Sequence, residues 1–205
     1  HPVKIITTGE GGMAVTNDLN LADKMRLFRS HGITSNKHLM SDNFESEIWN
    51  YQQIGLGYNY RMTDIQSALG ISQLRSIDDN VTTRHHIAKI YNSKLTHDDI
   101  KIPFQSPMTH SSYHLYPLMI NFDNLRITQK EFINNLLSND IGVNLHYIPV
   151  YLHPYYQKLG FSRGYCPNSE YYFRHALSIP MHPSLSMADV DKVINEIMGN
   201  LTKCQ

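Results

Sequence analysis

The sequence has few cysteines and no long hydrophobic run. Its 205 residues include only Cys166 and Cys204, which form no Cys-x-x-Cys pair. Two cysteines in this length are too few for a disulfide framework, so we expect a reducing, cytoplasmic environment. The apolar runs are a few residues long. A membrane-spanning helix needs roughly 20 apolar residues, so we expect no membrane partner.

The chain also has no excess of positive or negative charge. Eighteen basic and 18 acidic side chains give a formal net charge of zero. Nucleic-acid-binding proteins usually carry a basic stripe, so we expect no nucleic-acid partner. The 12 histidines follow no zinc-ligand spacing, and we expect no metal site. With 41% hydrophobic residues, the chain is typical of a globular protein that buries a core.

The first half of the chain mixes extended and helical patterns. Residues 3–7 and 13–16 predict two short strands, joined by a turn at Gly11 and Gly12 where positive φ is tolerated. Residues 33–56 lack periodicity, carry the only Trp and predict a long surface excursion. Helical spacing predicts three helices. They run from a cap at Asn17 or Asp18 to a stop at Gly32, over residues 61–74, and over residues 79–95.

The second half has an α+β pattern. Strands are predicted at 113–122 and 142–146, and a short helix at 169–177. Two further helices are predicted from their caps, with apolar residues such as Phe132 and Leu137 facing inward in the first. The caps are Thr128 with Glu131 and Ser186 with Asp189. We place the domain boundary in the polar connection 97–112, which gives domains at 1–109 and 110–205, although the preceding helix can also bridge them.

One lysine lies in a setting that suits amine chemistry. Lys4 stands between apolar residues, after His1 and Pro2 and before a glycine-rich turn. An isolated lysine is usually a solvated surface charge. Partial burial, however, lowers the pKa of a lysine because its ammonium group loses hydration. Covalent chemistry with a carbonyl requires a neutral amine. On these grounds alone, Lys4 is either a surface lysine or a catalytic one.

Three blocks of sequence resemble one enzyme family, in the same order. The family's lysine motif is approximately Ser-Phe-His-x-x-Lys-x-Ile-Thr-x-x-Glu-Gly-Gly. This chain matches it at His1, Lys4, Ile6, Thr7, Glu10, Gly11 and Gly12. The other blocks are Arg-Ser-His-Gly at 29–32 and Gly-Tyr-Asn-Tyr-Arg-Met-x-Asp-Ile-Gln at 57–66. By these blocks the chain is identified as a member of the DegT/DnrJ/EryC1/StrS sugar aminotransferase family.

The resemblance implies an α/β fold of the aspartate-aminotransferase type, which is pyridoxal-phosphate (PLP) fold type I. The chain would hold the end of the large cofactor domain and a small α+β C-terminal domain. Lys4 would bind pyridoxal 5′-phosphate covalently and serve as the catalytic residue. The family's partner of the pyridine nitrogen and most phosphate ligands precede this lysine. Because the sequence begins at His1 rather than Met, we expect that an N-terminal half is missing and that the chain alone is inactive.

Asn59 and Arg61 precede the predicted helix at 61–74. On the residues alone, Asn59 caps this helix, whose N-terminus also attracts anions. The resemblance implies instead that Asn59 crosses a homodimer interface to the cofactor phosphate or substrate of the partner subunit, so that the active sites are shared. Arg61 either lines the same mouth and contacts substrate or forms an ordinary first-turn ion pair.

A polar, aromatic-rich segment follows the strand predicted at 142–146. It comprises Asn144, Leu145, His146 and Tyr147, with Tyr151, Tyr155 and Tyr156 close behind. Either the tyrosines form a core edge with hydrated hydroxyl groups, or sugar and uracil rings bind there. The segment is similar to one subgroup of the family, which acts in pseudaminic acid biosynthesis. In that subgroup the equivalents of residues 144–147 contact the UDP-sugar.

The reaction implied by the resemblance is transfer of an amino group from L-glutamate to the 4-keto carbon of a UDP-linked 4-keto-6-deoxy N-acetyl hexosamine. Two alternatives stay open. In the first, the protein is an aminotransferase of the same family that acts on another nucleotide keto-sugar. In the second, it is a non-catalytic binding module of the same fold. An intact Lys4 favours an enzyme, because a binding module needs no amine there.

Overall fold

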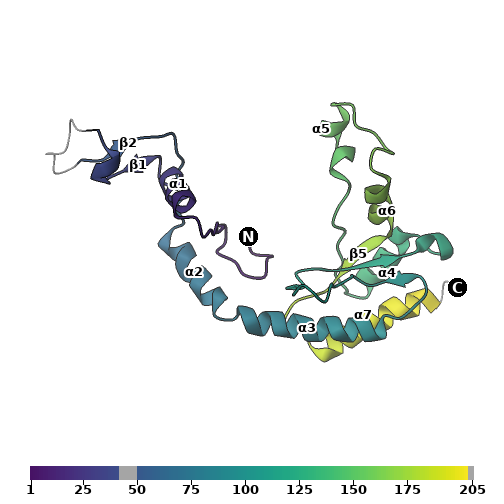
Figure 1. Ribbon diagram of the computed structural model, residues 1–205. Coiled ribbons are helices and arrows are strands. Elements are labelled where there is room, and N and C mark those ends of the chain that lie inside the picture. The colour runs from purple at the N-terminus through teal and green to yellow at the C-terminus, as the bar shows by residue number, and fades with distance from the viewer. Residues whose placement is uncertain (42–49, 203–205) are drawn as a thin grey trace. The chain divides into compact units, whose positions relative to one another are not determined.

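The chain forms two compact units, His1–Arg75 and Ser76–Gln205 (Figure 1). The computed structural model describes residues 1–41 and 50–202. The single Trp of the predicted surface excursion lies outside the described residues. Helix α3 (Ile77–Lys94) belongs to the second unit, because its buried side chains join the core of that unit. The domain boundary predicted at residues 109 and 110 concerns the whole protein, and it stays a prediction.

The first unit contains two helices and a small antiparallel ribbon. In chain order the elements are α1 (Leu19–Arg29), β1 (Ile33–Thr34), the 3-10 helix η1 (Lys37–Leu39), β2 (Gln52–Gln53) and α2 (Asp64–Leu74). The first 18 residues form no strand, so the two strands predicted there are wrong. A strand needs a hydrogen-bonded neighbour, and the described residues offer these segments none. In this stretch Gly9, with φ of 79°, has positive φ, rather than Gly11 or Gly12.

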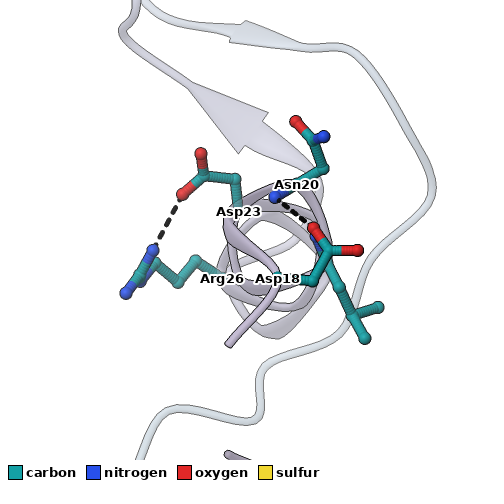
Figure 2. A network of polar contacts seen from close by, with 5 residues as sticks. Asp18, Asn20, Asp23 and Arg26 are labelled. Carbon is teal, nitrogen blue, oxygen red and sulfur yellow. Dashed lines mark hydrogen bonds and ion pairs between the residues drawn. The ribbon is translucent and has the colours of Figure 1, made fainter. Parts of the chain in front are cut away.

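Helix α1 begins at the predicted cap. The Asp18 carboxylate accepts hydrogen bonds from the backbone N–H groups of Asn20 and Leu21, at 2.9 and 3.2 Å. Figure 2 shows this cap, together with the ion pair between Asp23 and Arg26 at 2.8 Å on the side of the helix. Both members of that pair are exposed, so it stabilises the helix by only about 0.2–0.5 kcal/mol. The cap fixes where the helix starts.

Helix α2 is capped by a residue other than the one predicted. The Thr63 hydroxyl accepts from the Gln66 N–H, and the Gln66 side chain accepts from the Thr63 N–H, at 3.3 and 3.0 Å. This reciprocal pair is a capping box. Asn59 lies four residues before Thr63 and caps nothing, so its interpretation as a helix cap is wrong.

The first unit leaves most of its apolar side chains uncovered. Gly32 and Gly70 are its only buried residues within the described part. Helices α1 and α2 were predicted correctly from the spacing of their apolar residues. In this chain, however, the apolar faces of these helices pack against no core. Among the exposed apolar residues are Leu19, Leu21, Phe28, Leu56, Tyr58, Tyr60, Ile65, Leu69, Ile71 and Leu74.

The second unit is an antiparallel sheet packed with helices. Its strands are β3 (Ile100–Lys101), β4 (Tyr116–Ile120) and β5 (Ala176–Ile179), in the order β3-β4-β5. In addition to α3, its helices are α4 (Gln129–Ser138), α5 (Pro154–Gln157), α6 (Pro167–His175) and α7 (Met187–Thr202). Two 3-10 helices, η3 (Phe122–Asn124) and η4 (Val150–Leu152), complete it.

Strand β4 separates the core face of this sheet from its other face. Tyr116, Leu118 and Ile120 are fully buried in the core, whereas Pro117 and Met119 alternate with them and are only partly buried. Side chains alternate between faces along a strand. Each buried Leu or Ile contributes roughly 1.5–3 kcal/mol through the hydrophobic effect. Helix α7 packs against α3 and α4 around this core.

The structure confirms the locally encoded features of the second unit. Thr128 with Glu131 and Ser186 with Asp189 cap α4 and α7 as predicted. Predictions of strands, which depend on partners distant in the sequence, were less accurate. The strand predicted at 142–146 is a single bridge between Asn144 and Ser178. The helix predicted at 169–177 is α6, and the strand β5 that follows it was missed. Leu137, expected to face inward, is half exposed.

Candidate active site

Lys4 lines a pocket within the first unit. The pocket measures about 400 Å³, and small-molecule sites typically measure roughly 300–1,000 Å³. One wall is the N-terminal motif, with Thr7 and Thr8 beside Lys4, and the other is α2, including Ser67 and Ile71. Lys4 itself is exposed, so the partial burial expected from the sequence does not occur in this chain. Its role as a catalytic residue stays a prediction.

Small residues and one side-chain hydrogen bond hold the lysine motif against α2. The Gln66 amide donates to the Glu10 carbonyl at 2.9 Å. Gly70 is buried, and a Cβ atom added there would lie 2.9 Å from the Thr8 methyl group. A Cβ atom at Gly11 would also crowd Thr8. The glycines therefore allow the motif to lie directly on the helix, which shapes the pocket around Lys4.

The second and third motif blocks lie side by side through backbone hydrogen bonds. The Tyr58 N–H donates to the Phe28 carbonyl at 2.7 Å, and the His31 N–H donates to the Tyr58 carbonyl at 2.8 Å. The Tyr60 N–H donates to the Arg29 carbonyl at 2.9 Å. Blocks that lie more than 20 residues apart in the sequence thus form one rigid crossing at the end of α1.

Two glycines make this crossing possible. Gly32 has φ of 69°, in the left-handed region that favours glycine. A Cβ atom at Gly57 would lie 2.8 Å from the Phe28 carbonyl oxygen, 2.5 Å from the His31 carbonyl carbon and closer still to the Gly32 nitrogen. These are backbone atoms that cannot swing aside, so the close approach requires glycine at position 57.

Asn59 and Arg61 extend from this crossing. Asn59 forms a backbone bridge with Ser30, and its side chain is exposed. Arg61 is exposed and lines a second hollow of about 1,060 Å³, together with the ring of Tyr58. Tyr58 stacks on Tyr60 with ring centres 4.7 Å apart. Helix α2 begins at Asp64, so Arg61 is not in its first turn, and Arg61 forms no ion pair with any described residue.

The segment of residues 144–147 lies in the second unit and is fastened to β5. Asn144 exchanges two backbone hydrogen bonds with Ser178, at 3.0 and 2.7 Å. The Asn144 side chain accepts from the Leu145 N–H at 2.7 Å, so it shapes its own loop. His146 Nδ1 lies 2.9 Å from the Ser178 hydroxyl oxygen, and Tyr147 is 68% exposed. Their roles in substrate binding stay predictions.

A carboxylate clamp beside this segment was missed at the sequence level. The Tyr151 hydroxyl and the Gly164 N–H both donate to the Glu170 carboxylate, at 2.5 and 2.6 Å. These two hydrogen bonds lower the pKa of Glu170, which is only 9% exposed. The clamp ties the loop before α6 to that helix. Tyr151 and Glu170 are 19 residues apart, so no local pattern signals their contact.

Among residues 1–41 and 50–202, no group of three or more His, Cys, Asp or Glu side chains is placed to hold a metal ion. None of the helices in these same stretches has the length and apolar character needed to cross a membrane.

Comparison with solved proteins defines the class of the fold. Helicobacter pylori PseC, an aminotransferase involved in the biosynthesis of pseudoaminic acid, matches with a TM-score of 0.81 and 29% identity, over 99% of this chain and 52% of that chain. Streptococcus pneumoniae Spr1654 in its PMP form matches with a TM-score of 0.84 and 26% identity, over 99% and 52%. The α/β fold of the PLP-type sugar aminotransferases, expected from the sequence, is confirmed.

The sequence places the chain more narrowly. The pattern of the DegT/DnrJ/EryC1/StrS aminotransferase family matches residues 1–198, and the chain belongs to this family. The UDP-4-amino-4,6-dideoxy-N-acetyl-beta-L-altrosamine transaminase of Campylobacter jejuni is 35% identical over 208 residues. That match covers 99% of this chain and 51% of the relative. The chain thus spans about half the length of the curated relatives it matches.

Proposed function

We propose that the whole protein transfers an amino group from L-glutamate to the 4-keto carbon of a UDP-linked 4-keto-6-deoxy N-acetyl hexosamine, a step of pseudaminic acid biosynthesis. One observation carries the proposal. Lys4, in register with the family's lysine motif, lines a pocket of small-molecule size. A UDP-sugar transaminase and an aminotransferase of pseudoaminic acid biosynthesis are among the similar proteins, which supports the choice of substrate.

The residues of the pocket fit pyridoxal phosphate. Lys4 would provide the amine that binds it covalently, and the Thr7 and Thr8 hydroxyl groups beside it would hydrogen-bond to polar groups of the ring. Apolar side chains of Ile6 and Ile71 provide surfaces for the ring itself. When bound, the cofactor acts as an electron sink for the carbon that loses or gains the amine. The PLP and PMP forms of Spr1654 support this choice of cofactor.

Lys4 then has a second task, as the acid and base of the reaction. Its Nζ belongs to a short motif that is held against α2 and lines the pocket. From that position Nζ takes a proton from the amino-bearing carbon of glutamate and later gives one to the sugar carbon that receives the amine. Proton transfer by a positioned side chain typically contributes about 10²- to 10⁴-fold to the rate.

Residues 144–147 are proposed to bind the nucleotide sugar. Tyr147 offers an exposed aromatic face, and His146 offers a ring nitrogen beyond the one that faces Ser178. Aromatic rings and a few polar groups suit a ligand with a uracil, a sugar and a diphosphate. Arg61 is proposed to contact the same substrate through its positive charge. It lines an open hollow, where its guanidinium group is accessible to an anionic ligand.

A homodimer with shared sites completes the proposal. The exposed apolar side chains of the first unit leave a surface for the rest of the protein and for a partner subunit to cover. Asn59 projects from the crossing at the end of α1, with its side chain exposed. We propose that it reaches the cofactor phosphate or substrate of the partner subunit.

Mixing two inactive variants tests the shared site. Lys4→Ala and Asn59→Ala subunits of the full-length protein are expected to be nearly inactive alone. After subunit exchange, each heterodimer contains one doubly mutated site and one intact site, so partial activity should return. Transaminase assays before and after mixing measure this recovery, and labelled subunits verify the exchange. Exchange without any recovery would contradict a site shared between subunits.

Separate half-reactions test the choice of substrates. The full-length protein with PLP is expected to react with L-glutamate and then with the UDP-linked 4-keto sugar, with each step visible in the cofactor absorbance. L-aspartate and a dTDP-linked 4-keto sugar serve as matched controls and should react more slowly. Faster reaction with the dTDP sugar would assign a different keto-sugar. No spectral change with any amino donor would overturn the proposal in favour of a binding module.

A further inference from the structure

Ser178 lies in a regular strand and is hydrogen-bonded to the loop of residues 144–147. It lies in β5 opposite Pro117 of β4, and it is only 6% exposed. The N–H and carbonyl of Ser178 both pair with Asn144. The serine therefore links the rigid sheet to the segment of residues 144–147.

The side chain of Ser178 points away from the hydrophobic core. Its neighbours Leu177 and Ile179 are buried members of the core, and side chains alternate between faces along a strand. Ser178 thus shares the opposite face of the sheet with Pro117. His146 lies against that face, with Nδ1 2.9 Å from the Ser178 Oγ. The Tyr147 ring packs edge-on against the imidazole, with ring centres 4.6 Å apart, which restricts its rotation.

The hydrogen bond selects one form of the imidazole. In the part of the chain that the structure describes, His146 Nδ1 is the one partner of the Ser178 hydroxyl. Either atom can be the donor in this contact, but a buried hydroxyl proton without an acceptor is unfavourable, which favours donation from the Ser178 O–H to Nδ1. A neutral imidazole that accepts at Nδ1 carries its proton on Nε2. His146 then presents an N–H donor on the side away from the sheet.

We propose that Ser178 is a positioning residue that holds His146 in the Nε2–H form, so that His146 donates a hydrogen bond to an oxygen of the nucleotide sugar. This inference rests on the proposed function, in which His146 binds that substrate. A carbonyl oxygen of uracil, a hydroxyl oxygen of the sugar and a phosphate oxygen are all acceptors, and all suit an N–H donor. An amine or ammonium group at the same place would be disfavoured.

Kinetics of the full-length enzyme test the coupling between the two residues. His146→Ala should raise KM for the UDP-sugar by roughly 5- to 150-fold, as expected for the loss of a hydrogen bond to a polar or charged ligand. Ser178→Ala should raise it by roughly 3- to 10-fold, since the ring stays but loses its orientation. Ser178→Thr, which keeps the hydroxyl, should restore the wild-type KM. In the two Ser178 variants the glutamate half-reaction, which involves no nucleotide, should keep the wild-type rate.

The double variant and a spectroscopic measurement separate this role from a general structural one. If Ser178 acts through His146, adding Ser178→Ala to His146→Ala should raise KM no further, whereas additive effects would overturn the proposal. Nitrogen-15 NMR of histidine-labelled wild-type protein, with His146→Gln for assignment, should show His146 protonated at Nε2. Protonation at Nδ1 in the neutral ring would overturn the proposal as well. If His146→Ala leaves KM unchanged, substrate binding by His146 fails, while NMR still decides whether Ser178 sets the ring.

Discussion

Lys4→Ala is expected to lower the rate of transamination by the full-length protein by at least about 10²-fold, and by up to about 10⁴-fold. The variant lacks both the amine that binds the cofactor covalently and the base that moves the proton. Lys4 is exposed, so its truncation leaves the packing of the lysine motif on α2 in place. The circular dichroism spectrum and the melting temperature should match those of the wild type.

A matched control isolates the role of this lysine from a loss of positive charge. Lys24 is also exposed and lies on α1 of the same unit, outside both hollows described above. Lys24→Ala should keep the wild-type rate. Steady-state assays with saturating glutamate and UDP-sugar measure both variants. A Lys4→Ala enzyme that keeps more than about one-hundredth of the wild-type rate would show that the reaction proceeds without this amine.

Gly57→Ala is expected to destabilise the first unit by roughly 3 kcal/mol or more, because a Cβ atom at this position meets three backbone atoms. The crossing between the end of α1 and the segment before α2 must then open, and Asn59 moves with it. If the unit unfolds in the whole protein as part of a domain of roughly 150–250 residues, the melting temperature should fall by roughly 6–12 °C. Thermal unfolding of the full-length protein measures the change.

Gly12→Ala is the matched control for this substitution. Nothing lies within 4 Å of a Cβ atom at Gly12, and its φ is not positive. Its melting temperature should therefore stay close to that of the wild type. Equal melting temperatures for Gly57→Ala and wild type would mean that the close approach of the two motif blocks is absent in the whole protein.

Features encoded by neighbouring residues were predictable from the sequence. The Thr128 and Glu131 pair and the Ser186 and Asp189 pair each satisfy backbone groups within one helical turn, so the helix starts follow from four residues. The motif around Lys4 predicted a catalytic, cofactor-binding lysine, and the structure shows that Lys4 lines a pocket. Of the two interpretations of Asn59, the helix cap is wrong, because Thr63 caps the helix four residues later; contact with the cofactor phosphate or substrate stays a prediction.

Features that depend on distant residues were not predictable. Strand β5 is four residues long and entirely buried, so it shows no alternation of polar and apolar residues. Its Ser178 is an ordinary serine in the sequence, and it gains its role only by pairing with Asn144, 34 positions earlier. The pocket wall formed by Ser67 and Gly70 depends on packing against a motif about 60 residues away. No periodicity in the sequence identifies such a partner.

Reductive labelling tests most directly whether Lys4 binds the cofactor. Full-length protein loaded with pyridoxal phosphate is treated with borohydride, which makes the link between cofactor and lysine permanent, and is then digested and mapped by mass spectrometry. Lys4→Ala protein treated in the same way is the control. We expect one labelled peptide, which carries Lys4, and no label in the control. A label on any other lysine of the loaded wild-type protein would contradict this expectation.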